Sequence, residues 1–235
     1  MRLALTVLFS LGCLTAGRLC AQAAPPINAL TTAERDAGWQ LLFDGRTLDG
    51  WRGYMREDMP AGWQAADGLF TRVARAGDVI TTRTFRDFEL TFDFLVAEGG
   101  NSGIFYRAVE GPEFIYYFAP EYQILDDERH PDGRSPLTST GSNYAVNEAP
   151  RGVTKPAGEW NTGRIIVDGR HVEHWLNGQK VVEYESGSDD WSRRVAASKF
   201  RQWPEYGRAA EGHVGIQDHG SRVAYRNLKI REIRR

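Results

Sequence analysis

The stretch RIIVDGRHVEHWLNGQKVVEYE, residues 164–185, decides the fold class of this chain. It contains three runs rich in β-branched, aromatic and leucine side chains, at residues 164–167, 172–176 and 180–185. Asp168-Gly169 and Asn177-Gly178 separate these runs, and such dipeptides favour two-residue hairpin turns because both turn positions need a left-handed backbone. The stretch therefore predicts three antiparallel strands joined as a meander.

Shorter runs elsewhere repeat the strand pattern. Leu90, Phe92 and Phe94 alternate with polar residues within 88–95, as in a strand with one buried face. Further strands are expected at 103–109, 116–125, 213–218 and 222–230, the last two pairing around Gly220. Helical periodicity never exceeds about two turns, and one short helical turn is expected at residues 31–34. Short strands separated by turns predict an all-β protein, a β-sandwich or jelly roll.

Composition narrows the class of protein. The chain has 235 residues, of which 41% are hydrophobic and 26% charged, which suits one globular domain. The formal net charge is −2, and basic residues are not clustered along the chain. Because nucleic-acid binding needs a clustered basic surface, nucleic acid is not expected as a partner. The polar loop at 126–158 is long for a compact domain, and such loops commonly form the rim of a binding site.

The N-terminus has the features of a secretory signal peptide. A basic start is followed by an uncharged apolar stretch at 3–17 and by Ala21-Gln22-Ala23, which suits a cleavage site. A membrane span is not expected, because this stretch is too short. Both cysteines, Cys13 and Cys20, fall in the removed segment, and a lipid on Cys20 is the weaker alternative. The expected organisation is a signal peptide at 1–23, a linker with a short helix at 24–37, and one domain at 38–235, in the periplasm or secreted.

Nine short motifs occur in order along the predicted domain. They are LFDG (42–45), LDGW (48–51), NSGIFYR (101–107), EYQILD (121–126), GEWN (158–161), HWLNG (174–178), SKF (198–200), QDHG (217–220) and RN (226–227). In this set the chain resembles the 3-keto-disaccharide hydrolase domain family. The resemblance implies a concanavalin A-like jelly-roll sandwich of two curved antiparallel sheets, with the site on a concave face. It also implies action outside the cytoplasm on glycosides whose sugar carries a ketone at C3.

Strand alternation sorts the polar residues of these motifs, because neighbouring side chains point to opposite faces. If Tyr122 and Ile124 face the core, then Glu121 and Gln123 face away from it. The same reasoning places further polar residues on faces away from the core, namely Asn101, Arg107, Gln217 and His219. Should these faces converge, they would form a groove with a carboxylate, a guanidinium, amides and an imidazole, which suits a sugar.

Structural roles remain open for several of these residues. Glu121 and Arg107 would also suit a cross-strand ion pair, and His219 a turn. The acidic run that begins at Asp126 would suit a solvated loop, or a calcium ion, although the EF-hand pattern is absent. Trp160 would suit packing as well as sugar stacking. The sequence assigns no cofactor with certainty. Zinc chelation by residues 171 and 174 is not expected, because side chains three positions apart on a strand face opposite sides. The oligomeric state is open.

The implied chemistry assigns roles to the candidates. A C3 ketone acidifies the C2 proton, so a base can remove it and the C1 substituent can leave. Water addition then gives hydrolysis, and its omission gives a lyase. We expect Glu121 as the base, Arg107 or Lys199 as the cation at the C3 oxygen, and His219 as the acid. The expected substrate-binding residues are Gln123, Asn101, Gln217, Tyr144, Asp126 and Trp160. The alternative is a non-catalytic carbohydrate-binding module; the mixture of acids, bases and amides favours the enzyme.

Overall fold

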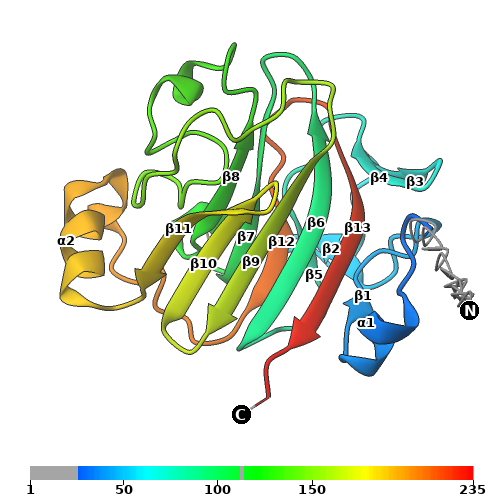
Figure 1. Ribbon diagram of the computed structural model, residues 1–235, viewed down its shortest axis with the longest axis horizontal. Coiled ribbons are helices and arrows are strands. Elements are labelled where there is room, and N and C mark those ends of the chain that lie inside the picture. The colour runs from blue at the N-terminus through cyan, green and yellow to red at the C-terminus, as the bar shows by residue number, and fades with distance from the viewer. Residues whose placement is uncertain (1–25, 112–113, 235) are drawn as a thin grey trace, which may run out of the picture.

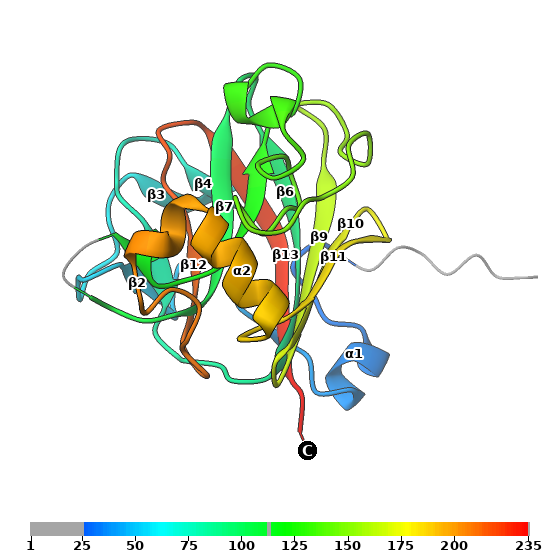
Figure 2. The same cartoon turned by 90° about the vertical axis from the view of Figure 1, so that its left-hand side faces the viewer.

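The computed structural model describes residues 26–111 and 114–234, and these form two antiparallel β-sheets packed face to face. Figure 1 shows the larger sheet in front of the smaller one, and Figure 2 shows the two layers from the side. The predicted all-β, concanavalin A-like sandwich is therefore confirmed. The signal peptide expected at residues 1–23 lies outside the described residues.

The first sheet has eight strands, with the order β11-β10-β9-β6-β13-β4-β3 and with β1 paired to β13. Its strands are β1 (Gln40–Leu41), β3 (Trp63–Ala66), β4 (Leu69–Arg72), β6 (Phe88–Val96), β9 (Asn161–Asp168), β10 (His171–Leu176), β11 (Gln179–Glu185) and β13 (Val223–Glu232). The predicted meander is confirmed as β9, β10 and β11, because β10 pairs antiparallel with both of the others.

The second sheet has five strands in the order β2-β5-β12-β7-β8. They are β2 (Trp51–Gly53), β5 (Val79–Thr81), β7 (Asn101–Ala108), β8 (Glu121–Leu125) and β12 (His213–Ile216). The expected pairing of 213–218 with 222–230 is wrong, because β12 belongs to this sheet and β13 to the first. The segment around Gly220 thus crosses from one sheet to the other, as connections in sandwiches commonly do.

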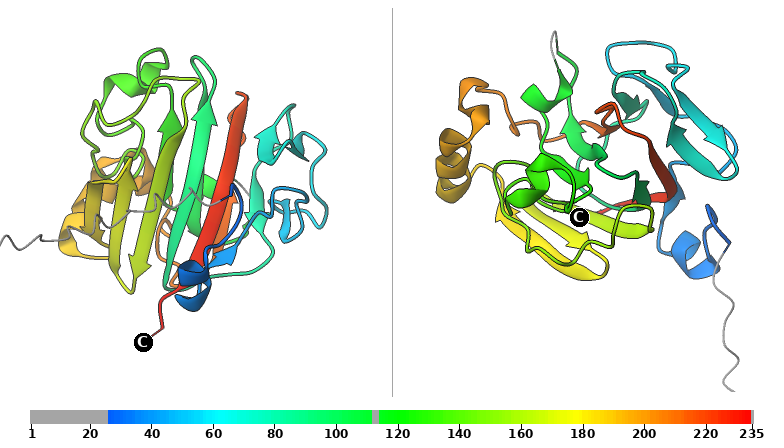
Figure 3. Two further views of the ribbon diagram at one scale, coloured as in Figure 1. Left: turned by 45° about the vertical axis from the view of Figure 1, so that its right-hand side comes forward. Right: turned by 90° about the horizontal axis from the view of Figure 1, so that it is seen from above.

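Helices lie at the margins of the sandwich. The helical turn expected at 31–34 is confirmed as α1 (Thr32–Asp36), which begins with a capping box between Thr31 and Glu34. The nine-residue helix α2 (Asp189–Ala197) was not expected, and η3 (Lys199–Gln202) follows it. Figure 3 shows α1 and α2 on opposite sides of the molecule. Within the described residues, no helix has the length and apolar character that crossing a membrane would require.

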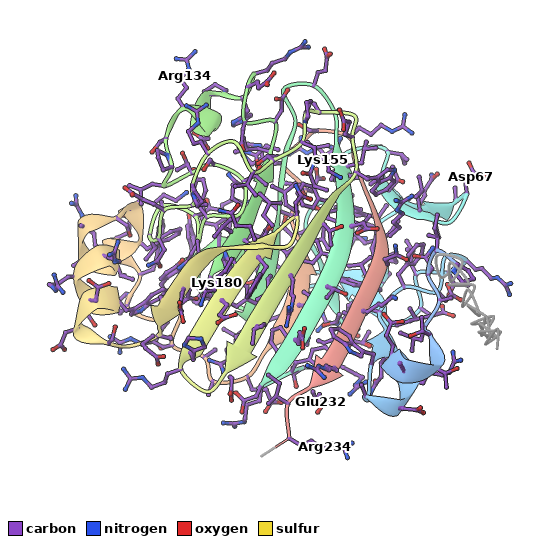
Figure 4. The ribbon with its side chains drawn as sticks, in the orientation of Figure 1. Asp67, Arg134, Lys155, Lys180, Glu232 and Arg234 are labelled. Carbon is purple, nitrogen blue, oxygen red and sulfur yellow. The ribbon has the colours of Figure 1, made fainter. Side chains whose placement is uncertain are left out.

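Part of the strand expected at 116–125 is a short 3-10 helix. Residues Ile115–Tyr117 form η1, and only Glu121–Leu125 form β8. Ile115 is fully buried against Phe105 on the face of the second sheet that points away from the first. Another 3-10 helix, η2 (Pro131–Arg134), lies in the long loop after β8, where Arg134 projects outward (Figure 4). The second sheet is therefore covered on its outer side by the apolar η1 and by the long polar loop that follows β8.

Aromatic side chains fill the space between the sheets. Phe92 of β6 packs edge-to-face on Tyr122 of β8, with ring centroids 5.3 Å apart. Leu90, Phe92 and Phe94 are fully buried, which confirms the predicted alternation in β6. Each such side chain contributes about 1.5–3 kcal/mol through burial. The same packing requires Tyr122 and Ile124 to face the core, so Glu121 and Gln123 must face the outer side of β8.

Candidate active site

A small cavity of about 170 Å³ opens on the outer side of the second sheet. Strands β7 and β8 form its floor, and η1, η3, the long loop and the segment after β12 form its walls. Its lining residues are Asn101, Tyr116, Glu121, Gln123, Tyr144, Lys199, Gln217 and His219. Seven of the ten site residues predicted from the sequence thus come together, from five separate segments.

The register of β7 on β8 creates the space for the carboxylate. Phe105 pairs with Glu121, and Gly103 pairs with Gln123. A Cβ atom at position 103 would overlap the Glu121 carboxylate, so the side chain lies across the neighbouring strand where only glycine leaves room. This glycine has a steric role, because it determines where the acid can point.

Glu121 is a buried carboxylate without a hydrogen-bond partner. The residue is 4% exposed, and its side chain makes no hydrogen bond or ion pair with any residue that the structure describes. Burial raises its pKa to about 8, the charges of Asp78 and Asp132 act in the same direction, and Lys199 opposes them. The alternative of an ion pair with Arg107 is wrong, because that guanidinium binds Asp87. An unpaired buried acid in a cavity is costly for folding and is typical of a functional group.

Lys199 provides the positive charge of the cavity. It is the first residue of η3, and the Ser198 hydroxyl caps this turn by accepting from the Phe200 N–H. Its Nζ lies 4.3 Å from the Tyr144 ring centroid and 5.3 Å from that of Tyr116. Loss of hydration lowers the pKa of Lys199 below its ordinary value, although Glu121 and Asp132 oppose this. Lys199 forms no direct ion pair within the described part of the chain, so its ammonium protons can bind a ligand oxygen.

Two glutamine side chains present unused hydrogen-bonding groups to the cavity. The Gln123 carbonyl oxygen accepts from the Ile124 N–H at 3.1 Å, which leaves its amide NH₂ to donate. The Gln217 carbonyl oxygen is buried and has no partner among the described residues. Buried polar atoms are seldom left unpaired unless a water or ligand completes them. A ligand hydroxyl could accept from Gln123 and donate to Gln217, as sugar hydroxyls do.

His130 determines how Asn101 presents its amide, a role that the sequence did not indicate. The His130 Nδ1 accepts from the Asp132 N–H at 3.2 Å, so a neutral ring carries its proton on Nε2. This Nε2 lies 3.4 Å from the Asn101 Nδ2, and the Asn101 side-chain oxygen has no partner among the described residues. The hydrogen-bond network decides the orientation of such an amide. Because the Nε2–H and the Nδ2 are both donors, we assign the amide with its oxygen and nitrogen exchanged, so that the oxygen accepts from His130 and the NH₂ faces the cavity.

His219 stands exposed at the cavity opening. The preceding residue, Asp218, fixes this segment because its carboxylate accepts from Arg72 Nε at 2.7 Å and from three backbone N–H groups. All of these contacts hold the loop, and none involves the His219 ring. Asp218 therefore holds the loop and does not orient the His219 ring. The His219 ring instead meets the His130 ring edge-on, with centroids 6.2 Å apart.

Tyr144 lies in the cavity as expected, but its hydroxyl is already a donor. It donates to Asp132 Oδ2 at 3.0 Å, and burial together with this acid raises the pKa of Tyr144. The ring supports the Lys199 ammonium. From the ligand's side, the Tyr144 oxygen can only accept. Tyr116 was not predicted for the site, because it was assigned to a strand.

Arg107 does not share the cavity with Glu121, and this prediction is corrected. A bulge opposite β12 gives Arg107 a left-handed backbone with φ 49°, which interrupts the side-chain alternation of β7. Its guanidinium donates to the backbone oxygens of Arg86 and Gly169 and to Asp87. These contacts join the ends of β6, β7 and β9, so Arg107 has a structural role.

Asp126 and Trp160 also lie outside the cavity. Asp126 is buried, but its carboxylate accepts from the N–H groups of Gly99, Glu128 and Arg129 at 2.8–3.3 Å. Trp160 packs against Arg226 of the first sheet, with the guanidinium carbon 4.0 Å from the ring centroid. Their expected role in substrate binding is corrected for a geometric reason: these contacts direct both side chains elsewhere.

The acidic loop offers few free oxygens for calcium. Besides Asp126, the Asp127 carboxylate accepts from the Thr140 N–H and the Thr154 hydroxyl. Calcium normally needs six to eight oxygen ligands, and these two carboxylates are already used to hold the loop. A divalent cation here remains a prediction, which chelation experiments must test.

A second cluster of metal-binding residue types lies on the outer face of the first sheet. The ligand atoms of His171, Glu173 and Glu183 lie within 4.8 Å of one another. Lys180, labelled in Figure 4, donates to both glutamates, at 3.3 and 2.6 Å, and offsets part of their negative charge. His174 faces the opposite side of β10, as alternation predicts, and binds the Tyr106 hydroxyl in the core.

A larger cavity of about 580 Å³ adjoins the first. The two share Tyr116, Gln217 and His219. The residues that only the larger cavity contacts are Tyr54, Arg56, Arg72, Arg75, Ala76, Gly77, Asp78, Phe114, Asp218 and Gly220. The arrangement thus offers a polar pocket with one acid and one cation, next to a wider pocket with an aromatic wall.

Comparison with known proteins agrees with this geometry. A model of the 3-keto-alpha-glucoside-1,2-lyase-like domain matches residues 38–231. The chain belongs to this family. It is also 36% identical to a 3-keto-disaccharide hydrolase of Bacteroides thetaiotaomicron, over 87% of this chain and 84% of that protein. The resemblance predicted from the nine sequence motifs is therefore confirmed.

Solved structures place this family member among glycoside hydrolase-like enzymes. The fold matches a candidate glycosyl hydrolase of Parabacteroides distasonis with a TM-score of 0.82 and 34% identity, over 89% of this chain and 100% of that one. A second candidate glycosyl hydrolase of that organism matches with a TM-score of 0.67 and 28% identity, over 83% of this chain and 99% of that one. The prediction of a glycoside hydrolase-like enzyme is confirmed.

Proposed function

We propose that this protein cleaves glycosides whose sugar carries a ketone at C3, and that Glu121 begins the reaction by removing the C2 proton. The observation that carries the proposal is the isolation of Glu121: it is the only carboxylate among the residues that line the small cavity. Ordinary retaining or inverting hydrolysis needs two carboxylates that flank the bond. Proton removal next to a ketone needs one base and a positive group for the oxygen that becomes negative.

The electrostatics of the pocket support this assignment. A pKa of about 8 makes Glu121 a far stronger base than an ordinary glutamate, while enough of it stays ionised near neutral pH. Lys199, which forms no ion pair with any residue that the structure describes, would bind the C3 oxygen as it gains charge in the enolate. Because the Glu121 end of the pocket is buried, this attraction acts in a lower dielectric than that of water and is stronger there.

The proposed sequence of steps keeps atoms and protons in balance. Glu121 takes the C2 proton, the C1–oxygen bond breaks, and the leaving oxygen receives a proton from a separate acid in the site, which regains a proton from the water that adds next. Water then adds at C1 while Glu121 returns its proton to C2, which gives net hydrolysis; release before water addition gives a lyase. Asn101, Gln123 and Gln217 would hold the ring hydroxyls during both steps. His219, at the boundary of the two cavities, would contact the leaving group.

The direct test uses matched substrates that differ only in oxidation at C3. Purified protein is incubated in D₂O with 3-keto-lactose or with lactose, with and without EDTA, and products are followed by mass. We expect cleavage of the keto sugar, deuterium at C2, and at least about 100-fold slower cleavage of lactose, since positioned acid–base groups contribute about 10²–10⁴-fold. Equal cleavage of lactose would contradict the proposal, and binding without cleavage would favour the non-catalytic module. Loss of activity with EDTA would show that a cation takes part.

Secretion to the periplasm or beyond is part of the proposal. It rests on the basic start, the apolar stretch and the Ala-x-Ala motif that ends at Ala23. Intact-mass measurement of protein secreted from a native-type host should show a chain that begins at residue 24. A retained Met1, or a lipid on Cys20, would contradict this.

A further inference from the structure

The larger cavity contains two carboxylates that differ in how they are bound. Asp218 is saturated: it accepts from Arg72, Ala76, Gly77 and Gly220, and these bonds lower its pKa. It therefore stays ionised and holds the loop in place. A group saturated in this way has no free oxygen with which to meet a ligand.

Asp78 differs because only one of its two carboxylate oxygens accepts a hydrogen bond from the described residues. It comes directly before β5, and its Oδ1 accepts from the Asp218 N–H at 2.8 Å. Its Oδ2 has no partner within the described part of the chain, and the side chain lines the cavity. Burial raises the pKa of Asp78 to about 6, and the nearby Asp218 charge adds to this effect. Asp78 therefore binds a proton more readily than an ordinary aspartate, although less readily than Glu121, so the state with protonated Asp78 and ionised Glu121 is the minor one from which the reaction starts.

The charge of Asp78 acts on Glu121 across the boundary of the two cavities. The Asp78 charge is among the causes that raise the pKa of Glu121. A reaction that moves one proton onto Glu121 and another off Asp78 leaves the total charge of the pair unchanged. Such an exchange avoids placing two negative carboxylates together, which like-charge repulsion would disfavour.

We propose that the larger cavity holds the leaving group and that Asp78 donates the proton to the leaving oxygen as the C1–oxygen bond breaks. This rests on the function proposed above. In the forward step Glu121 gains the C2 proton and Asp78 loses its own to the departing alcohol. In the return step water adds at C1, its proton passes to the Asp78 carboxylate, and Glu121 returns a proton to C2. Every bond and proton in net hydrolysis is then accounted for.

His219 suits this proton transfer less well than Asp78. It stands exposed at the opening, where only the edge-on ring contact with His130 orients it. Asp78 is held by its bond to the Asp218 N–H, and Arg72 keeps Asp218 in place. A proton donor needs a fixed position relative to the leaving oxygen, and the fixed group here is Asp78. His219 then contributes to binding at the boundary.

The test compares two leaving groups in the Asp78→Asn variant. Asparagine keeps an oxygen for the Asp218 N–H, so the loop is preserved. With 3-keto-lactose, whose leaving sugar needs a proton, we expect kcat to fall by about 10²–10⁴. With 4-nitrophenyl 3-keto-glucoside, whose phenolate departs without one, we expect a fall of less than about tenfold. Retained activity on the nitrophenyl substrate also shows that the variant is folded.

Matched variants separate the outcomes. Asp78→Ser should show the same leaving-group selectivity, which guards against a special effect of asparagine. His219→Gln should reduce the rates on both substrates by similar factors. Equal losses on both substrates in the Asp78 variants, or no loss on either, would overturn the role of Asp78. Failure of the unmodified enzyme to prefer keto sugars would instead overturn the proposed function.

Discussion

Two buried glutamates, one in each sheet, have opposite surroundings. Glu89 of β6 is 5% exposed and Glu121 of β8 is 4% exposed, so water reaches both poorly. Glu89 lies between two arginines, with Arg164 Nε at 2.6 Å and Arg231 Nε at 2.7 Å. Glu121 has no such partner among residues 26–111 and 114–234, and it faces a cavity that Lys199 also lines.

This difference separates structural from functional burial. A buried carboxylate normally needs compensation from a cation or from hydrogen bonds, and Glu89 has it. Glu121 has no such compensation, so its burial lowers the free energy of unfolding, and a role in binding a ligand would explain why the residue is present. If this interpretation is right, changing Glu121 should affect catalysis and changing Glu89 should affect stability.

The largest effect is expected for Glu121→Gln. The change keeps the shape of the side chain but removes the base, so kcat on a 3-keto-glycoside should fall by at least about 10²-fold with little change in KM. Glu89→Gln is the matched control, and its kcat should stay within about threefold of the unmodified enzyme. Steady-state kinetics measure both. Near-native turnover by Glu121→Gln would show that the base is another group.

A somewhat smaller loss is expected for Lys199→Met. Methionine preserves most of the packing against Tyr144 and Tyr116 but supplies no charge for the C3 oxygen. Removing one group that stabilises an oxyanion costs about 10²-fold in kcat. Because Lys199 also opposes the raised pKa of Glu121, the rising limb of the pH–rate profile should move to higher pH. Unchanged kinetics and an unchanged profile would assign Lys199 a packing role.

The pH dependence should report the ionisation of Glu121. With 4-nitrophenyl 3-keto-glucoside, whose leaving group needs no proton from Asp78, only the ionisation of Glu121 matters, so kcat/KM should rise about tenfold per pH unit below about 8 and level off above it. The groups that face this carboxylate or act on its charge are Lys199, Asp78, Asp132 and His219. Because the pKa of Lys199 is lowered, any decrease in kcat/KM at high pH should begin at a lower pH than it would with an ordinary lysine. An optimum below pH 6 would contradict the assignment of Glu121.

The smallest effects are on stability, and they should have opposite signs for the two glutamates. Glu89→Gln leaves two arginines without their acidic partner. Because both arginines are more than one-third exposed, we expect the free energy of unfolding to fall by only about 1–2 kcal/mol. Each kcal/mol lost should lower Tm by about 2–4 °C. Glu121→Gln should instead stabilise the protein at neutral pH. Thermal unfolding measures both variants, and equal destabilisation would remove the distinction between the two sites.

The sign for Glu121 follows from its two pKa values. Its pKa is about 8 in the folded protein and near 4.5 in the unfolded chain. Between these values the unfolded chain releases the proton and the folded protein keeps it, so the stability of the unmodified protein falls as pH rises through this window. Glutamine does not titrate. The advantage of Glu121→Gln in unfolding free energy should therefore grow from about pH 4.5 to about pH 8.

Sequence patterns by themselves determined the fold class and one face of the site. Alternation in β6 and the Asx-Gly turns of the β9–β11 meander reflect local rules of backbone geometry, and the tertiary structure confirms them. The same parity placed Glu121 and Gln123 on the outer side of β8, since Tyr122 and Ile124 must be buried. Both conclusions depend only on residues that are close together in the chain, which is why the sequence was sufficient to predict them.

Only the tertiary structure decided which polar groups meet. The bulge at Arg107 depends on how β7 pairs with β12, more than 100 residues away, and this pairing sends the guanidinium to Asp87. His130 and Asp78 occur in no sequence motif, yet the loops bring them to Asn101 and to the second cavity. Their chemistry comes from burial, and burial depends on contacts between distant segments. Local sequence carries the side-chain alternation of a strand, whereas the environment that sets a pKa exists only in the folded chain.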